Sequence, residues 1–399
     1  MPDAVLALNA GSSSLKFALF EAAADGPKCI LSGKIDGIGR EGGPHAVARN
    51  AAGEVRWEKR WPAARELDQD AMLGPVLDFV ASHLGEEGLA AIGHRIVHGG
   101  TNFVAPALLD AGTMAKLDAL CPLAPLHQPH NLAAVKAVAA MRPGLPQVGC
   151  FDTAFHAGQD ATVTRIALPR DLAEEAGLRR YGFHGLSYDY IAGRLRELDA
   201  AAGTSRVIVA HLGAGASLCA LRDGNSVETT MGFSVLDGLV MATRPGALDP
   251  GVVLYLAREK GMAVADIEDM LYHRSGLLGV SGITGDMKAL LASGEPHAKE
   301  AIDLYVWRIA RESAALAGTL GGLDAFVFTA GVGENAPSIR RAVAARLAWL
   351  GVALDEAANA AGRLCISQPS SRVSVWAIPT DEELVIARGT LACLARQAA

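Results

Sequence analysis

Two arginines in apolar surroundings are the first candidates for chemistry in this chain. Arg95 lies in the short apolar segment 91–97, and Arg244 follows an apolar stretch with two hydroxyl residues nearby. Burying a guanidinium is costly unless an anion neutralises it, so either could bind a carboxylate or a phosphate. For Arg95, a structural ion pair explains the same pattern equally well.

Asp152 ends an apolar strand that opens at Pro146. The commoner role of an acid at such a place is to cap the next turn of the chain. The alternative is a catalytic or magnesium-orienting carboxylate, because α/β proteins place their chemistry at strand ends. Cys150 and His156 could also form a nucleophile pair, although nothing marks Cys150 as reactive.

Three histidines are also candidate functional residues, one for a ligand site and two for a metal site. His184 lies in segment 179–187 with two arginines and two aromatic residues between glycines, a cluster that usually serves a ligand. His94 and His98 could converge on a metal only in a helix. The glycines around them argue against a helix, so zinc is not expected.

A repeated strand–turn–strand segment must position these side chains. The first copy has strands at 5–8 and 15–20 around a polar turn, and the second has strands at 207–210 and 218–221. Aligned, Asn9 matches His211 and Gly11 matches Gly213. Such turns offer backbone N–H groups to an anion, with Lys16 adding a cation in the first. The repeat predicts two similar domains with their turns at a shared cleft.

Two later segments have the arrangement of ligand sites. Strand 325–329 feeds the Gly331-Val332-Gly333 turn before a helix from about Pro337, which is typical of a nucleotide cradle, although a lone G-x-G is common. Strand 373–378 ends at Asp381-Glu382-Glu383. These acids either cap a helix or hold magnesium.

Length and composition set further bounds. A chain of 399 residues suggests two domains, and its formal charge of −7 without basic blocks makes nucleic acid an unlikely partner. The N-terminus lacks a signal-peptide pattern, and no stretch reads as a membrane span. The six cysteines are scattered without metal-ligand spacing, which indicates a cytoplasmic protein with reduced thiols.

Seven motifs, in order, resemble the acetate kinase family over nearly the whole chain. This family belongs to the superfamily of sugar kinases, actin and the heat-shock chaperone ATPases. The motifs are Asn9-Ala10-Gly11-Ser12-Ser13-Ser14-Leu15-Lys16, Gly93-His94-Arg95-Ile96-Val97-His98-Gly99-Gly100, Phe151-Asp152-Thr153-Ala154-Phe155-His156, Tyr181-Gly182-Phe183-His184-Gly185, His211-Leu212-Gly213, Gly331-Val332-Gly333-Glu334-Asn335 and Asp381-Glu382-Glu383.

The resemblance implies a fold and an activity. The fold would be α/β, with two duplicated ribonuclease-H-like (actin-like ATPase) domains around an interdomain cleft, residues 1–150 with 385–399 and residues 151–384. The activity would be reversible transfer of a phosphoryl group from ATP to acetate, giving acetyl phosphate and ADP, a step linked to acetyl-CoA biosynthesis. It would need Mg²⁺, with Mn²⁺ possible, in a cytoplasmic homodimer with no membrane partner.

Site residues follow from matching motif to motif. The family's metal positions match Asn9 and Glu382, and its phosphate end matches Ser12, Ser14 and Lys16. The catalytic positions match Arg95, Asp152, His184 and Arg244. The acetate pocket matches Arg95, Val97, Leu126, Phe183 and Val235. The nucleotide segments match His211, Leu212, Gly213, Ala214, Gly215, Asp286, Met287, Lys288, Gly331, Val332, Gly333, Glu334 and Asn335.

The physics of these roles leads to three expectations. A carboxylate attacking a triphosphate meets like charge, so the site needs cations. Acetate is already ionised at neutral pH, so Asp152 is expected to orient magnesium or an arginine more than to move a proton. Replacing Arg95 or Arg244 is expected to reduce catalysis and barely change stability.

The chain also departs from the family pattern. Ala214 replaces a usual Asn, Val235 a frequent Pro, Tyr188 a frequent His, and Met287-Lys288 the Phe-Arg of some members. Because Val235 reshapes the acyl pocket, a propionate or butyrate kinase is the alternative enzyme. A chaperone-like nucleotide switch is the alternative of another class, but no residues are left over for a peptide-binding domain.

Overall fold

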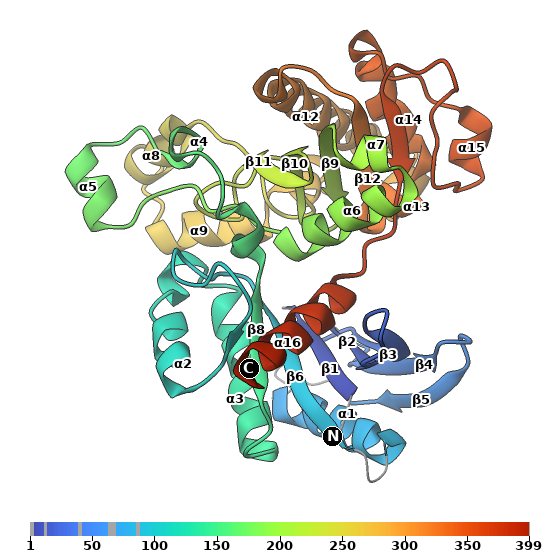
Figure 1. The fold of residues 1–399 in the computed structure, drawn as a ribbon. Coiled ribbons are helices and arrows are strands. Elements are labelled where there is room, and N and C mark those ends of the chain that lie inside the picture. Colours follow the sequence, from blue (N-terminus) through green and yellow to red (C-terminus); the bar gives the residue numbers. More distant parts are fainter. Residues whose placement is uncertain (1–3, 12–13, 39–41, 63–68, 85–87, 399) are drawn as a thin grey trace. The chain divides into compact units, whose positions relative to one another are not determined.

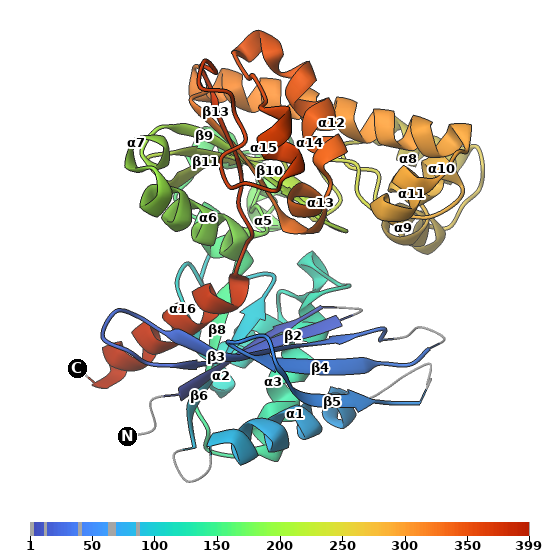
Figure 2. The ribbon, with the colours of Figure 1, turned by 90° about the vertical axis from the view of Figure 1, so that its right-hand side faces the viewer.

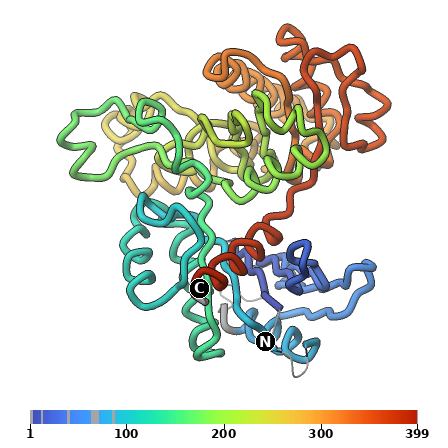
Figure 3. Tube along the Cα trace, viewed as in Figure 1, coloured from blue at the N-terminus to red at the C-terminus, as the bar shows by residue number. Residues whose placement is uncertain are grey.

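A computed structural model describes residues 4–11, 14–38, 42–62, 69–84 and 88–398. The chain, coloured along its sequence in Figure 1, divides into two compact units. Unit 1 contains Met1–Phe155 and Asp381–Ala399, and unit 2 contains His156–Thr380. The C-terminal segment therefore returns to the unit in which the chain begins, which the tube in Figure 3 makes easy to follow.

Unit 1 is built on an eight-stranded sheet with the order β5-β4-β3-β2-β1-β6-β8-β7. Strands β1 to β5 are antiparallel neighbours, whereas β1, β6 and β8 run parallel. The strands are β1 (Ala4–Ala10), β2 (Ser14–Glu21), β3 (Lys28–Asp36), β4 (His45–Asn50), β5 (Val55–Arg60), β6 (Leu89–Ile96), β7 (Ala107–Leu108) and β8 (Gln147–Phe151).

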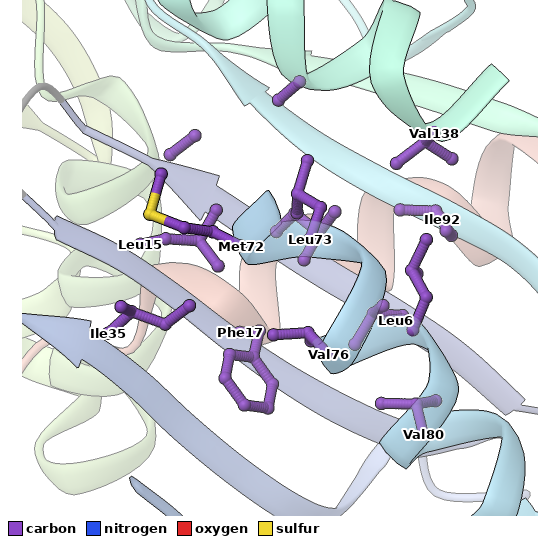
Figure 4. Close-up of a cluster of buried hydrophobic side chains, with 14 of the residues drawn as sticks. Leu6, Leu15, Phe17, Ile35, Met72, Leu73, Val76, Val80, Ile92 and Val138 are labelled. Carbon is purple, nitrogen blue, oxygen red and sulfur yellow. The ribbon is translucent and has the colours of Figure 1, made fainter. Parts of the chain in front are cut away.

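Helices cover both faces of this sheet. Alternate residues of β1 point to opposite faces, so Leu6 and Leu8 pack with α1 in the core that Figure 4 shows. On the other face, a Cβ at Gly93 would lie 2.1 Å from Thr390 Oγ1, so only glycine lets α16 approach β6 this closely. The helices of unit 1 are α1 (Gln69–Leu84), α2 (Ala111–Asp118), α3 (Gln128–Met141) and α16 (Glu382–Ala398), with a 3₁₀ turn at Cys121–Leu123 (Figure 2).

Unit 2 has a five-stranded sheet with the order β11-β10-β9-β12-β13. Strand β10 is antiparallel to β9 and β11, and β12 is parallel to β9 and β13. The strands are β9 (Arg206–Leu212), β10 (Ala216–Arg222), β11 (Asn225–Thr229), β12 (Ala325–Thr329) and β13 (Ser374–Ala377).

Helices make up most of the rest of unit 2. The longest, α12, packs on β9, β10 and β11 through its buried face, which includes Tyr305 and Ile309. The helices are α4 (Ala161–Thr164), α5 (Arg170–Glu175), α6 (Gly185–Leu198), α7 (Ala200–Gly203), α8 (Pro250–Arg258), α9 (Val264–His273), α10 (Gly276–Ser281), α11 (Met287–Ala292), α12 (Pro296–Leu320), α13 (Ala330–Asn335), α14 (Pro337–Arg346) and α15 (Glu356–Ala360); 3₁₀ turns span Asp152–His156, which begins in unit 1, and Ala348–Leu350.

The two sheets share one plan. Strands β3-β2-β1-β6-β8 of unit 1 correspond in order and direction to β11-β10-β9-β12-β13 of unit 2. Both predicted hairpins are present, with Asn9 paired to Lys16 and His211 paired to Ser217. The α/β class and the duplication predicted from the hairpins are therefore confirmed.

One local expectation differs from the structure. Gly331-Val332-Gly333 was expected to be an open turn, but residues 330–335 form the short helix α13. Ala330 takes a left-handed conformation (φ 64°), which turns the chain sharply from β12 into that helix. Separately, no helix in the described part of the chain is long and apolar enough to span a bilayer.

Candidate active site

In unit 1, three polar side chains meet because their strands are parallel. Asn9 lies near the carboxyl end of β1, Arg95 near that of β6, and Asp152 directly after β8. Parallel strands present their carboxyl ends at one edge, where α/β proteins commonly place ligands. The edge therefore brings together residues that are 86 and 57 positions apart in sequence.

Arg95 and Asp152 form a buried ion pair. Arg95 Nη2 lies 2.6 Å from Asp152 Oδ2, and Nε lies 3.1 Å from the same oxygen. The Asp152 side chain is only 1% exposed. Burial alone would lower the pKa of Arg95, but Asp152, Glu382 and Glu383 outweigh it and raise that pKa above its ordinary value. Of the two sequence interpretations of Arg95, the ion pair is thus present, and Arg95 Nη1 still reaches Asn9 Oδ1 at 3.2 Å.

Two acids at the start of α16 complete this cluster. The Asn9 amide donates to Glu382 Oε2 at 2.8 Å and to Glu383 Oε1 at 3.0 Å. Burial, reinforced by Glu382, raises the pKa of Glu383 against the opposing effect of Lys16. A cation placed among these oxygens would reduce the repulsion between the carboxylates of Glu382 and Glu383.

The donor set fits a hard divalent cation that is only partly bound by protein. Within the described ranges, no group of three or more His, Cys, Asp or Glu side chains is arranged to hold a metal by itself. Mg²⁺ commonly takes one or two carboxylates and obtains its other ligands from water and substrate phosphates. The amide oxygen of Asn9 and the carboxylate of Glu382 are suitable oxygen donors of this kind.

The first hairpin turn adds a cation beside the acids. Lys16 is exposed on β2, directly across from Asn9. It lines a cavity of about 490 Å³ together with Lys34, Asp381 and Glu383. Ser14 O accepts a hydrogen bond from the backbone of Gly11 at 2.9 Å, whereas Ser12 lies outside the described residues.

The predicted acyl-pocket residues of unit 1 follow β6. Val97 is buried, and its N–H donates to Asn131 Oδ1 at 3.0 Å. The Asn131 amide donates in turn to Ala10 O at 2.8 Å, so one side chain fixes the ends of both β1 and β6. Leu126 is half-buried in the loop before α3. Next to Val97, burial lowers the pKa of His98 to about 4, which keeps the imidazole neutral.

In unit 2, two imidazoles stack where the second hairpin meets α6. The rings of His184 and His211 are 4.1 Å apart and tilted by 16°. His211 Nδ1 lies 2.8 Å from Ser187 Oγ, and His184 Nδ1 lies 2.8 Å from Ser217 Oγ. His184 itself precedes α6 in a left-handed conformation (φ 58°), which is uncommon for a residue other than glycine.

Arg244 lies against the Gly213–Gly215 turn. A Cβ at Gly215 would come within 2.9 Å of Arg244 Nη2 and 3.2 Å of His184 Nε2, so glycine leaves room for both. Arg244 Nη1 donates to Val235 O at 2.8 Å, and burial lowers the pKa of the guanidinium to about 10. No carboxylate of the described residues is within ion-pair distance of it. Such a cation is suited to bind an anion from solution.

The predicted nucleotide segments of unit 2 lie at element ends. His211 and Leu212 end β9, and Gly213 to Gly215 join it to β10. Asp286 caps α11, which begins with Met287 and Lys288, and Gly331 to Asn335 form most of α13. Behind α13, the fully buried Arg340 donates to Gly333 O at 2.9 Å and Glu334 O at 2.7 Å. Phe183 and Val235, predicted for the acyl pocket, are both buried in this unit.

Each unit thus gathers its own share of the predicted residues. Unit 1 brings together Asn9, Arg95, Asp152 and Glu382, and unit 2 brings together His184, His211 and Arg244. Of the residues of the alternative Cys150–His156 pair, Cys150 Sγ lies 3.8 Å from Ile386 O, and His156 contacts Ser226 and Phe183 O.

Supporting side chains were not identified as site residues from the sequence. They are Asn131, Ser187, Ser217 and Arg340. Each is a polar residue within or beside an apolar segment or a recognised motif. That position in the sequence is the signal that could have identified it. Their roles depend on contacts with residues distant in sequence, which a pattern does not reveal.

Comparisons with known proteins agree on one family. The model described as the acetokinase family matches residues 4–388. An acetate kinase of Rhodopseudomonas palustris is 54% identical over 395 residues, covering 97% of this chain and 98% of the relative. A crystal structure of a propionate kinase from Francisella tularensis has a TM-score of 0.88 at 35% identity, covering 97% of this chain and 98% of that chain. A crystal structure of acetate kinase from Porphyromonas gingivalis has a TM-score of 0.84 at 35% identity, covering 98% and 100%.

Proposed function

The chain belongs to the acetokinase family, and from this premise we propose that it is an ATP:acetate phosphotransferase that reversibly forms acetyl phosphate and ADP. The observation that supports this most directly is Arg244, a half-buried guanidinium whose polar contact is a carbonyl rather than a carboxylate. A site that joins acetate to a phosphoryl group needs such a cation, because both reactants are anions.

The other residues of unit 2 have complementary roles in this proposal. His184 donates a hydrogen bond from Nε2 to the transferring phosphoryl group, beside Arg244. The His211–Gly215 turn, Asp286–Lys288 and Gly331–Asn335 bind the nucleotide. Arg340 holds the carbonyls of α13 from behind, so that this segment keeps its shape when ATP binds.

In this proposal, unit 1 contributes the acidic side chains that lie at the carboxyl ends of its parallel strands and at the start of α16. Asn9 and Glu382 would hold Mg²⁺, for which Mn²⁺ could substitute, and the ion would neutralise phosphate charge when bound. Lys16, with Ser12 and Ser14, binds phosphate oxygens. Arg95 binds acetate, and Asp152 orients its guanidinium through the bidentate contact rather than moving a proton. Acetate reaches the site already ionised, so no base is required.

Hydroxylamine trapping tests the activity directly. Acyl phosphates react with hydroxylamine to give hydroxamates, so the protein with ATP, Mg²⁺ and acetate should accumulate acetohydroxamate. The absence of trapped product with acetate, propionate and butyrate would contradict an acyl kinase and leave the nucleotide-switch alternative. A kcat/KM for propionate above that for acetate would favour the propionate kinase alternative.

Acyl-chain length should depend on Val97. We propose that Val97, Leu126, Phe183 and Val235 bind the methyl group, with Val97 as a limiting wall; Val97 and Phe183 are both buried. A methylene in an apolar pocket is worth roughly 1 to 3 kcal/mol of discrimination, so Val97→Ala should raise the propionate-to-acetate ratio of kcat/KM by about tenfold or more. The kcat for acetate should be largely kept.

A matched control distinguishes an effect of pocket size on the propionate-to-acetate ratio from a general effect of losing the methyl groups of a valine. Val55 is exposed on β5, so Val55→Ala removes the same methyl groups away from this segment and should leave the ratio unchanged. An unchanged ratio in Val97→Ala itself would assign the length limit to another wall, with Val235 as the first to test.

We further propose a homodimer that associates through helices of unit 2. Helix α8 has no buried residue, and it exposes Val252, Leu254 and Tyr255 to 41%, 58% and 51%. Val264 at the start of α9 is 79% exposed. Apolar residues grouped in this way typically mark a protein interface. Sedimentation analysis should give twice the chain mass of 41.4 kDa, and a mass of one chain would contradict the proposal.

Two remaining proposals concern domains and location. We propose that units 1 and 2 are the two actin-like ATPase domains, a view that their common strand order supports. We also propose a cytoplasmic location, because the six cysteines are scattered without the paired spacing of a disulfide framework.

A further inference from the structure

The hydroxyl of Ser217 is a junction between two aromatic side chains of unit 2. It lies 2.8 Å from His184 Nδ1 and 2.5 Å from the phenol oxygen of Tyr188. Ser217 and Tyr188 are both completely buried. This junction therefore links the proposed phosphoryl-binding histidine to a residue at which the chain departs from the usual family pattern.

Local structure explains why the three groups meet. Tyr188 follows His184 by four residues, and its N–H donates to His184 O at 3.1 Å, so both side chains lie on the same side of the first turn of α6. Ser217 is the cross-strand partner of His211 in the β9–β10 hairpin. Its side chain therefore faces the same way as the imidazole on which His184 stacks.

The number of available protons limits the possible directions of these hydrogen bonds. A serine hydroxyl has one proton, so Ser217 can donate to only one of its two partners. A phenol is a stronger acid than an aliphatic alcohol, so Tyr188 is the better donor. In the arrangement that this favours, Tyr188 donates to Ser217, and Ser217 donates to His184 Nδ1. With Nδ1 accepting, the proton of the neutral imidazole is on Nε2.

The Nε2 proton of His184 and the guanidinium of Arg244 are close to the same position, next to Gly215. A Cβ built on Gly215 would be 3.2 Å from His184 Nε2 and 2.9 Å from Arg244 Nη2. We propose that Tyr188, acting through Ser217, is a positioning residue that fixes the Nε2–H form of His184, so that this N–H and Arg244 address the same anion. The inference rests on the proposed phosphotransferase function.

The tautomer can be measured without catalysis. Nitrogen-15 NMR of histidine-labelled protein distinguishes a protonated from an unprotonated ring nitrogen, and His184→Gln identifies the His184 signals. In the wild type, Nε2 should be protonated and Nδ1 should not. Tyr188→Phe should shift the His184 signals toward a mixture of both forms. A wild-type Nδ1 that is protonated would overturn the proposal.

Kinetics test whether the effect passes through His184. Tyr188→Phe should lower kcat about three- to tenfold, the size of one net hydrogen bond, while the KM values for ATP and acetate change less than about twofold. In a His184→Ala background the same substitution should cost nothing further, because residues that act as one unit are not additive. Equal losses in both backgrounds would overturn the role of Tyr188 and leave that of His184 intact.

Further variants provide a control for Tyr188→Phe and a second test of the same hydrogen bonds. Tyr305 is a buried tyrosine of α12 whose hydroxyl has no hydrogen-bond partner among the described residues, so Tyr305→Phe should leave kcat unchanged. If Tyr188→Phe does not fold, Ser217→Ala breaks the same junction and should show the same loss and the same lack of additivity. A normal kcat in His184→Ala would instead contradict the proposed function of His184 itself.

Discussion

Replacing Arg244 by Ala is expected to lower kcat/KM for acetate by about 10³, the upper range for removing one contact that stabilises transition-state charge. The free energy of unfolding should barely change. Arg244 makes a hydrogen bond to Val235 O, and in the described part of the chain no carboxylate is within ion-pair distance. Because burial disfavours its charge and lowers its pKa to about 10, removing the guanidinium sacrifices little stability.

Acyl-phosphate trapping and denaturant unfolding measure the two effects separately. Arg206→Ala is a matched control from the same unit, since Arg206 begins β9 and pairs with Asp324 at 2.7 Å. It should leave kcat/KM unchanged. Arg244→Lys should recover only part of the activity, because an ammonium group lacks the planar, forked geometry of guanidinium. Near-normal turnover in Arg244→Ala would remove Arg244 from the reaction.

Replacing Arg95 by Ala is expected to cause a similar loss of kcat/KM and, in addition, a large loss of stability. Breaking a buried ion pair by removing one partner typically costs about 3–5 kcal/mol, because the other charge stays buried without compensation. Asp152, whose side chain is 1% exposed, would lose its contact with Arg95. The sequence alone led to the expectation that stability would barely change, and the Arg95–Asp152 contact is the reason for expecting a larger loss.

A second substitution separates the two roles of Arg95. Adding Asp152→Asn to Arg95→Ala removes the charge that has lost its contact with Arg95, so part of the unfolding free energy should return while activity should not. Arg142→Ala is the control, since its ion pair with Asp78 is exposed and worth about 1 kcal/mol or less. A folded Arg95→Ala variant with normal turnover would make the ion pair purely structural. An unchanged unfolding free energy would show that the pair does not stabilise unit 1.

The duplicated architecture could be predicted because it depends on local signals. Two apolar runs around a polar turn specify a hairpin wherever they occur, and both copies formed as β1–β2 and β9–β10. The motifs around Asn9, Arg95, Asp152 and Glu382 identified a plausible set of polar residues in the same way.

Contacts between distant segments could not be predicted in this way. The partner of Arg95 follows from the parallel pairing of β6 with β8, which places Asp152 beside it. The junction at Ser217 likewise requires α6 to lie on the β9–β10 hairpin. The conformation of Ala330 could not be predicted from the sequence either. Its left-handed backbone is locally unfavourable for alanine, and it persists because the surrounding fold maintains it.

The sequence by itself therefore determined the fold class, the family and the residue types available for the reaction. Those features are encoded by short-range patterns and by motif order, which need no knowledge of packing. Only the tertiary structure decided which charges are paired and which are not, so that Arg95 has Asp152 whereas Arg244 has a carbonyl. The physical reason is that electrostatic energies depend on separation and burial in space, and the chain brings these groups together from positions far apart in sequence.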